Sequence, residues 1–527
     1  MKKKAGKGGE SGRRLPDSRQ LDLLTGPWAP FEMPCSTAEA TDFINPSPDD
    51  IYVGNVRLRA YLADRGLGHV LKLREFIFGS DLTPFLSGYS NLGRRAVHPG
   101  ILLSLIMYGM MEGKWSLRDL EGLAVKDACA WWLCSGVQPD HSTIGNFINR
   151  FSEVLTEEYF ISLTKSLVAE LNLGLGSVSG DGTVIEAVSS RYRTIKKEAA
   201  AQALEQAKAL AAEHPDDQAR QSELGQAQSV LDEIFRREAF ARENGQKKSP
   251  MVCPGEPEAV LQPLKNKSHR PSYKPCLLAN SAQMIVGKNV QASDEGSSVA
   301  PMLAEYRAIF NRLPERALFD AGYCNYKVLS LCVELELDTL CPAGKGDREQ
   351  FAKQGYSGKF SKSDFKYDAG RDGYLCPAGK LLRRESGFTR NGQSCVEYSC
   401  KECSGCVDRG KCTEAKKGRK IKRWSVDEYK EAMSEVFEHP GARKIYGQRK
   451  AMVEPVFSGI KQIQKLIRFH RRGLRGANLE FALHCEAHNL KKAAKLKIRA
   501  VLSVIFAENR AGFRLLCFFA FIFRAEE

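Results

Sequence analysis

Apolar residues recur at helical spacing from residue 40 to residue 172, and this periodicity predicts a bundle of short helices. Ser116 stands where the helix of SLRDLEGLA needs an N-cap. In PDHSTIGNFINRF, a turn leads into an amphipathic helix, for which we expect Ser142 or Thr143 as the cap. Short helices joined by tight turns are typical of DNA-binding domains, and a helical support domain is the alternative.

The pattern changes at Leu173 to short apolar or alternating runs bounded by Gly, Ser and Asn, which predict strands. Two such runs are GLGSVSGDGTVIEAV and KPCLLANSAQMIVGKNVQAS. An amphipathic helix, SSVAPMLAEYRAIFNRL, then precedes the strand RALFD, the helix YKVLSLCVELEL and the strand DTLCPAG. Strands that alternate with helices predict an α/β domain built in layers.

Two segments interrupt this pattern and are not needed to build the sheet. Residues 194–246, rich in Ala, Glu, Gln and Lys, predict a helical hairpin, and residues 345–425 are Gly-rich, cationic and rich in cysteine. The predicted organisation is a flexible basic arm at 1–40, an all-helical domain at 41–172, an α/β domain at 173–500 with insertions at 194–246 and 345–425, and an apolar tail at 501–527.

The balance of charge points to a polyanionic partner. The chain of 527 residues carries a formal net charge of +15, which favours nucleic acid or an anionic membrane surface over a small neutral substrate. From Lys411 to Arg475 there are 18 Lys and Arg against 7 Asp and Glu. No apolar run reaches the about 20 residues that span a bilayer, and no signal peptide is recognisable. We therefore expect a cytoplasmic protein with no membrane partner.

Three carboxylates stand out. Asp181 follows the strand-like VSG and Asp320 ends the strand RALFD, and ligands gather at the carboxyl ends of strands in α/β sheets. The alternative for each is an ordinary turn aspartate. Glu454 lies among arginines and lysines, and Pro455 behind it means that either a helix begins there or a longer helix is kinked. Four other acids are expected around the site or at the surface: Glu186, Glu256, Glu258 and Asp294.

These three segments, in this order, resemble the acidic blocks of bacterial insertion-sequence DDE transposases. The blocks are GDGT at 180–183, FDAGY at 319–323 and YGQRKAMVEPVFSGIK at 446–461. The last resembles the branch with a Tyr-Arg-Glu-Lys signature, here Tyr446, Arg449, Glu454 and Lys461, with four residues between the arginine and the glutamate where the signature has at most three. VHPGILLSLIMYG, SLRDLEGLA and PDHSTIGNF resemble the N-terminal domain of that group, and FHRRGLRGANLEFALHCEAHNLKKAA resembles its C-terminal end.

The resemblance implies an RNase H-like catalytic domain, a mixed sheet flanked by helices, with Asp181 on the first strand, Asp320 after the fourth and Glu454 on a later helix. It implies that these carboxylates hold two Mg²⁺ or Mn²⁺ ions for phosphodiester cleavage and strand transfer. Tyr446, Arg449 and Lys461 would then bind DNA near the cut.

The implied function is cut-and-paste transposition of an element whose terminal inverted repeats the protein binds in double-stranded DNA. Bringing two ends together implies at least a homodimer. One alternative is a degenerate or domesticated copy that acts as a DNA-binding protein or nuclease. Another is a zinc-containing nucleic-acid-binding or scaffold protein whose acids are structural.

A group of cysteines is a separate candidate site. Cys400, Cys403, Cys406 and Cys412 lie in CKECSGCVDRGKC, and Cys376 lies upstream in CPAG. The Cys403-x-x-Cys406 spacing suits tetrahedral Zn²⁺, with Cys376 and Cys412 as the other ligands and Cys400 as the rival of Cys376. We expect either structural zinc or a reduced cluster without metal.

Overall fold

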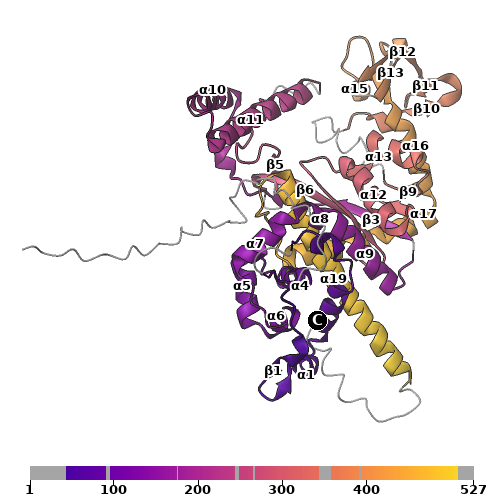
Figure 1. Cartoon of the computed structure of the whole chain (residues 1–527). Helices are drawn as coiled ribbons and strands as arrows, with labels where there is room; N and C mark the ends of the chain where they lie inside the picture. The colour runs from indigo at the N-terminus through magenta and orange to yellow at the C-terminus, as the bar shows by residue number, and fades with distance from the viewer. Residues whose placement is uncertain are drawn as a thin grey trace, which may run out of the picture.

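The structure is a computed structural model, and it describes residues 43–90, 95–174, 176–243, 249–264, 267–342, 358–390 and 393–508. The predicted basic arm at 1–40 lies outside these residues, as do parts of both predicted insertions and most of the apolar tail. The described chain contains a helical region, a mixed sheet with its helices, a helical hairpin and a second sheet (Figure 1). Within it, no helix combines the length and the apolar character needed to cross a membrane.

The N-terminal region is mostly helical. Ser116 accepts a hydrogen bond from Asp119 N at 3.2 Å and caps the helix Leu117–Lys126 (α5), as its sequence predicts. The expected cap of the helix His141–Arg150 (α7), Ser142 or Thr143, was wrong. Asp140 is the cap and accepts from Thr143 N at 2.6 Å, because a carboxylate one residue before the helix reaches its third N–H. The helices are α1 Leu58–Asp64, α2 Gly68–Phe78, α3 Thr83–Leu86, α4 Pro99–Met111, α5 Leu117–Lys126, α6 Ala128–Leu133, α7 His141–Arg150, α8 Ser152–Thr156 and α9 Glu158–Glu170.

The expectation that this region is entirely helical was wrong. A two-stranded antiparallel hairpin precedes α1 and consists of β1 Tyr52–Val53 and β2 Val56–Arg57. Each strand has two residues, too few for an alternating pattern to be visible in the sequence. In contrast, the apolar run at 99–111 forms α4, which is buried along its whole length.

The main sheet has seven strands: β3 Ser177–Gly182, β4 Ile185–Glu186, β5 Val260–Pro263, β6 His269–Asn280, β7 Ile285–Gln291, β8 Arg316–Leu318 and β9 Thr339–Leu340. The central strand β3 pairs antiparallel with β6 and parallel with β8, β8 pairs parallel with β9, and β7 pairs antiparallel with the other side of β6. Because β3 and β8 are parallel, the residues that follow them lie at the same edge of the sheet.

Helices cover both faces of this sheet. They are α12 Val299–Phe310, α13 Tyr326–Glu334, α16 Ser425–Glu438, α17 Pro440–Gly447, α18 Arg449–Ser458, a π-helical turn at Gly459–Ile463, and α19 Gly473–Glu508. Neighbouring residues of β6 point to opposite faces, so Leu278 joins a core shared with the N-terminal helices, whereas Leu277 joins a core formed with α18 and α19. The helical region and the sheet therefore share one continuous apolar core.

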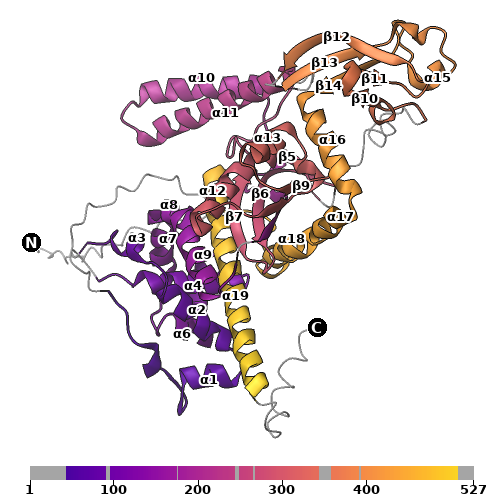
Figure 2. The same cartoon turned by 90° about the vertical axis from the view of Figure 1, so that its right-hand side faces the viewer.

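The long helix α19 connects these parts (Figure 2). Its Asn478 and Asn489 side chains accept hydrogen bonds from Val290 N at 3.0 Å and Ile285 N at 2.8 Å, and Asn489 also donates to Ile285 O at 2.8 Å. These bonds satisfy backbone groups on the edge of β7 that does not face β6. Further along, α19 packs against α2, α4, α8 and α9.

Two lobes extend away from the helical region (Figures 1 and 2). One is the hairpin of α10 Lys197–Glu213 and α11 Gln218–Glu243. The other is an antiparallel sheet of β10 Lys366–Asp368, β11 Gly373–Leu375, β12 Leu381–Arg390, β13 Gln393–Ser399 and β14 Lys420–Trp424, in sequential order. This second sheet has a small core of its own: Phe365, Tyr374, Leu382, Tyr398, Cys400 and Ile421. α16 follows β14 directly and leads back to the main sheet.

Candidate active site

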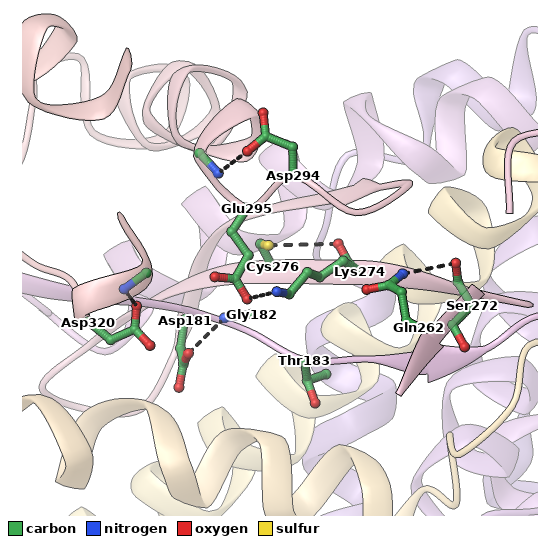
Figure 3. Close-up of polar contacts among 12 residues, drawn as sticks. Asp181, Gly182, Thr183, Gln262, Ser272, Lys274, Cys276, Asp294, Glu295 and Asp320 are labelled. Carbon is green, nitrogen blue, oxygen red and sulfur yellow. Dashed lines mark hydrogen bonds and ion pairs between the residues drawn. The ribbon is translucent and has the colours of Figure 1, made fainter. Parts of the chain in front are cut away.

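Asp181 and Asp320 lie side by side at the edge where β3 and β8 end. The parallel register pairs Ser177 with Arg316 and Ser179 with Leu318, and the same offset continued by two residues sets Asp181 level with Asp320. Asp181 Oδ1 accepts from Gly182 N at 2.9 Å, and Asp320 Oδ1 accepts from Gly322 N at 2.8 Å (Figure 3). The local backbone thus orients both carboxylates.

The electrostatics around Asp181 disfavour its charge. Burial is the largest cause and raises the pKa of the Asp181 carboxyl, and the nearby carboxylates of Asp320 and Glu295 raise it further. Arg449 and the Gly182 N–H act in the opposite direction. An excess of negative charge at a half-buried edge is an environment that a bound cation would stabilise.

Glu295 is a site residue that the sequence did not reveal. Its carboxylate forms an ion pair with Lys274 Nζ at 2.5 Å (Figure 3). A Cβ added to Gly182 would lie 2.9 Å from Glu295 Oε1, and a Cβ added to Gly322 would lie 3.0 Å from Oε2. The Glu295 carboxylate therefore lies between the segments that carry the two aspartates, and both segments need glycine beside it.

Asp294, which was expected around the site or at the surface, lies at the surface. It is exposed, and its Oδ1 accepts from Gly296 N at 3.0 Å. No signal in the sequence separates Glu295 from Asp294, because both acids follow β7 and only the assembled sheet brings Glu295 against the two aspartate segments.

Arg449 is buried beside the first acid. Its Nη1 lies 3.5 Å from Asp181 Oδ2 and makes no hydrogen bond within the described residues. Tyr446, just before it, packs edge-on against Phe437 with ring centroids 5.1 Å apart, and burial raises the pKa of its hydroxyl. The structure therefore brings Arg449 and Asp181 together and leaves Tyr446 half-buried beneath them, against Leu318 and its neighbours.

Lys461 reaches the same strand from the π-helical turn. Its Nζ donates hydrogen bonds to Thr183 Oγ1 and to Val184 O, the latter at 3.2 Å. Thr183 and Val184 follow β3 immediately, so Arg449 and Lys461 contact the end of this strand from opposite ends of one helical segment. Between these two contacts α18 packs directly against β3.

Glu454 lies on α18 between these two cations in the chain. It is exposed, and it forms no hydrogen bond or ion pair with any described residue. Of the two alternatives for Pro455, the one in which a helix begins there is wrong, because α18 begins at Arg449 and Pro455 lies inside this longer helix. A proline has no N–H for the carbonyl four residues earlier. Gln283 Nε2 supplies the missing donor, at 3.0 Å from Ala451 O.

The other acids have structural or surface positions. Glu256 is buried and accepts hydrogen bonds from Ser189 N at 2.5 Å and Gly473 N at 3.1 Å, so it anchors the start of α19. Glu186 lies 4.0 Å from Arg270, and Glu258 lines a cavity bounded by α8 and α19. None of the three contacts Asp181 or Asp320 within the part of the chain that the structure describes.

The donor chemistry of the site suits a hard divalent cation, because carboxylate oxygens are the ligands that Mg²⁺ prefers. Asp181, Asp320 and Glu295 converge on one edge, and Glu454 offers an unpaired carboxylate on the helix that packs beside it. In the described residues, however, no three His, Cys, Asp or Glu side chains are already arranged as ligands of a metal ion. Asp181 and Asp320 therefore lie at one edge, whereas no contact within the described residues joins Glu454 to either of them.

A basic cavity of about 390 Å³ lies beyond the end of β4. Arg193, Arg468 and Arg472 line it, together with backbone and small side chains near Ser189. Arg468 donates to Ala187 O at 3.2 Å, and Lys461 donates to Val184 O. Both cations therefore contact the short stretch of chain that follows β3.

The cysteines predicted to bind zinc also come together, in the second sheet. Cys376, Cys400, Cys403, Cys406 and Cys412 line one small cavity. Burial is the largest cause that raises the pKa of the Cys412 thiol, and Cys403, Cys376 and Cys406 contribute in the same direction.

Comparison with known proteins identifies two segments. Residues 375–494 match the family described as Transposase DDE domain, and residues 65–150 match the Transposase domain DUF772. The first match contains Glu454 and the Tyr446, Arg449 and Lys461 positions, whereas Asp181 and Asp320 lie outside both matches. No curated protein matches the chain. Transposases act on DNA, and DDE transposases use divalent metal ions. The chain therefore carries a DDE transposase domain, preceded by a second transposase domain within its N-terminal helices.

Proposed function

We propose that the protein is a cut-and-paste transposase of the bacterial insertion-sequence type, in the branch with the Tyr-Arg-Glu-Lys signature, which binds the terminal inverted repeats of its element and cuts and joins the DNA. The observation that carries this proposal is the parallel pairing of β3 and β8, with Asp181 and Asp320 at one edge. The third acid, Glu454, lies within the match to the transposase DDE domain.

The strand order supports an RNase H-like catalytic domain. Along β7, β6, β3, β8 and β9, only β6 runs antiparallel to the others. In the RNase H-like fold implied by the resemblance, the acids follow the first and fourth strands. Asp181 and Asp320 have these positions when β3, β6, β7 and β8 are counted as strands one to four.

Asp181, Asp320 and Glu454 are the proposed ligands of two Mg²⁺ or Mn²⁺ ions. When bound, such a pair stabilises negative charge on the attacking and leaving oxygens of a phosphodiester displacement. The carboxylate of Glu454 is exposed and free of hydrogen bonds and ion pairs in the described chain, so it is available to a ligand. The Glu295 carboxylate, paired with Lys274, lies between the two aspartate segments.

The cations on α18 and the π-helical turn are proposed to hold DNA phosphates. Arg449 carries a planar guanidinium, which suits a phosphate, and it is buried beside Asp181, so the phosphate that it would hold is the one at the proposed metal site. Lys461 lies on the π-helical turn and contacts Val184, just after β3, so it places a second positive charge beside the same edge. The arginines of the basic cavity extend this surface. In a duplex lying across it, they would bind phosphates beyond the cut.

The decisive experiment is metal-dependent cleavage of DNA that carries the ends of the protein's own locus. Wild-type protein is expected to cut at the ends in Mg²⁺, whereas Asp181→Ala, Asp320→Ala and Glu454→Ala lose cleavage and keep DNA binding. Full activity in all three variants would overturn the site assignment. Binding without any cleavage by wild-type protein would instead support the alternative of a degenerate transposase that only binds DNA.

Joining two ends requires at least two copies of the chain at the moment of reaction, so a homodimer is the proposed active form. Sedimentation of the protein with and without DNA that carries one end tests this. A complex that contains two ends and two chains is expected, and a single chain on a single end throughout cleavage would contradict it.

A further inference from the structure

The five clustered cysteines come from separate parts of the second sheet. Cys376 follows β11, Cys400 follows β13, and Cys412 ends the short helix α15, Arg409–Cys412. Cys403 and Cys406 lie in the connection between β13 and α15. All five line one cavity of about 20 Å³, into which three cationic residues also project: Lys380, Arg409 and Arg419.

Backbone groups lie close to two of these sulfur atoms, Cys376 Sγ and Cys403 Sγ. Lys380 N donates to Cys376 Sγ at 3.2 Å, in a tight turn closed by Gly379 N to Cys376 O at 2.8 Å. Amide hydrogen bonds to a coordinating atom are the usual support around a metal ligand. Gly418, at φ +87°, approaches so closely that an added Cβ would lie 3.1 Å from Cys403 Sγ. A side chain at position 418 would therefore collide with the cluster.

We propose that Cys376, Cys403, Cys406 and Cys412 bind one structural Zn²⁺ ion, and that Cys400 does not. Four thiolates are the standard ligand set of a closed zinc site, and Cys403-x-x-Cys406 has the spacing of a zinc knuckle. In the described chain no group of His, Cys, Asp and Glu side chains is already arranged as metal ligands, and this holds for the four thiols too. On this proposal, the four thiols that line the cavity come within bonding distance of one ion when it binds.

Cys400 is excluded by its surroundings. It is 4% exposed and belongs to the apolar core of the second sheet with Phe365, Tyr374 and Leu382. The other four cysteines are partly exposed, and three of them, Cys376, Cys403 and Cys412, pack against the outside of that core. Of the five, Cys400 is thus the one that packs as a buried hydrophobic residue.

Charge and stability both favour an ion at this place. A zinc ion with four thiolates carries a net charge of about −2, which Lys380, Arg409 and Arg419 offset. Arg409 and Arg419 also donate to Cys403 O at 3.2 Å and Cys412 O at 3.4 Å, so the cations are fixed to the ligand segments. Within the described residues the apolar cluster of this sheet has six buried members, and lobes with so small a core generally need a metal or disulfides. The cysteines here are free thiols.

The proposed zinc site does not depend on transposition, and metal analysis of the purified full-length chain tests it. About one equivalent of Zn²⁺ per chain is expected for wild-type protein and for Cys400→Ser, against less than about a tenth for Cys403→Ser and Cys412→Ser. Zinc well below half an equivalent in wild-type protein would overturn the site. Loss of zinc in Cys400→Ser equal to that in Cys403→Ser would overturn the ligand assignment.

A variant that fails to fold does not decide the question, so wild-type protein provides a second measurement. Replacement of the bound ion by Co²⁺ is expected to give intense thiolate-to-cobalt absorption and the visible bands of a tetrahedral site. The Cys400→Ser protein is expected to give the same spectrum. A spectrum with only octahedral features, or with no thiolate band, would contradict the proposal.

Discussion

Arg449 and Asp181 form an ion pair between α18 and the end of β3, with Nη1 3.5 Å from Oδ2. Both side chains are largely buried, at 11% and 22% exposure, so solvent screens this pair less than a surface pair. Arg449 lowers the pKa of Asp181 against the larger, opposing effect of burial. The arginine therefore helps to keep the proposed metal ligand ionised.

Removal of that arginine should change how activity depends on pH. In Arg449→Ala the pKa of Asp181 rises further, so the ionised form that can bind a cation is lost at a higher pH. The acidic limb of the pH profile of cleavage is expected to move to higher pH. Arg449→Lys retains the charge and is expected to move it less. An unchanged acidic limb in Arg449→Ala would show that Asp181 does not control it.

Glu295 should affect metal binding more than DNA binding. Glu295→Gln removes a negative charge beside both aspartates and weakens the pair with Lys274, so the Mg²⁺ concentration for half-maximal cleavage is expected to rise several-fold. Asp294→Asn is the matched control, because Asp294 is the adjacent acid but is exposed and caps a turn. Equal effects of the two substitutions, or a change confined to DNA affinity, would contradict a role beside the metal ligands.

The arginines of the basic cavity should contribute phosphate contacts that are independent of sequence. Arg193→Ala and Arg472→Ala are expected to weaken binding of specific and random DNA equally, and each to reduce the slope of log affinity against log salt by about 1. Arg236→Ala on the helical hairpin is a control outside the cavity, since Arg236 pairs with Glu233 at 2.6 Å. An unchanged salt slope in both cavity variants would remove this surface from the DNA path.

The sequence predicted where the candidate site lies in the fold more fully than it predicted which residues surround the two aspartates. Asp181 and Asp320 each end a short apolar run, and a parallel pair of strands brings such ends together, which is what β3 and β8 do. Glu295 gave no comparable signal, because its position against Gly182 and Gly322 arises only when β7, β3 and β8 are assembled. The support that Gln283 gives to the helix around Pro455 likewise joins residues 168 positions apart.

Two predictions for the N-terminal region differ from the structure for reasons that lie in the local sequence. The cap of α7 was misassigned because Asp140, Ser142 and Thr143 are all good cap residues, and only the start of the helix decides among them. The hairpin of β1 and β2 escaped notice because two-residue strands carry no periodicity. The grouping of Cys376 with the cysteines at 400–412 was predicted from the sequence, and the pairing of β11, β12 and β13 brings Cys376 to the same cavity.

Asn489 should be a major determinant of stability. Its side chain is fully buried and satisfies both Ile285 N and Ile285 O on the edge of β7. Asn489→Leu leaves both groups without partners, and a loss of about 2–4 kcal/mol in the free energy of unfolding is expected. Asn478→Leu, at the partly exposed site beside Val290, is expected to cost less. Equal or negligible losses, measured by urea denaturation, would contradict this role.

Glu486 on the same helix should destabilise the protein increasingly as pH rises. Its carboxylate is fully buried, and neither oxygen has a hydrogen-bond partner in the described chain. Burial raises the pKa of Glu486 well above its usual value, and the charge of Lys288 opposes this only in part. The folded state therefore keeps a proton that the unfolded state releases, so stability falls with pH from the unfolded pKa, near about 4.3, up to the raised folded pKa.

Glu486→Gln removes this titration, so the variant is expected to gain stability relative to wild type as pH rises from 5 to 8, by on the order of 1 kcal/mol or more at neutral pH. Thermal unfolding across this pH range measures the difference. Glu480→Gln is the matched control on the same helix, because the Glu480 carboxylate accepts hydrogen bonds from His470 N at 2.9 Å and Arg471 N at 2.9 Å. That control should lose stability at neutral pH. A Glu486→Gln protein less stable than wild type at pH 8 would mean that the carboxylate is ionised and paired in the folded chain.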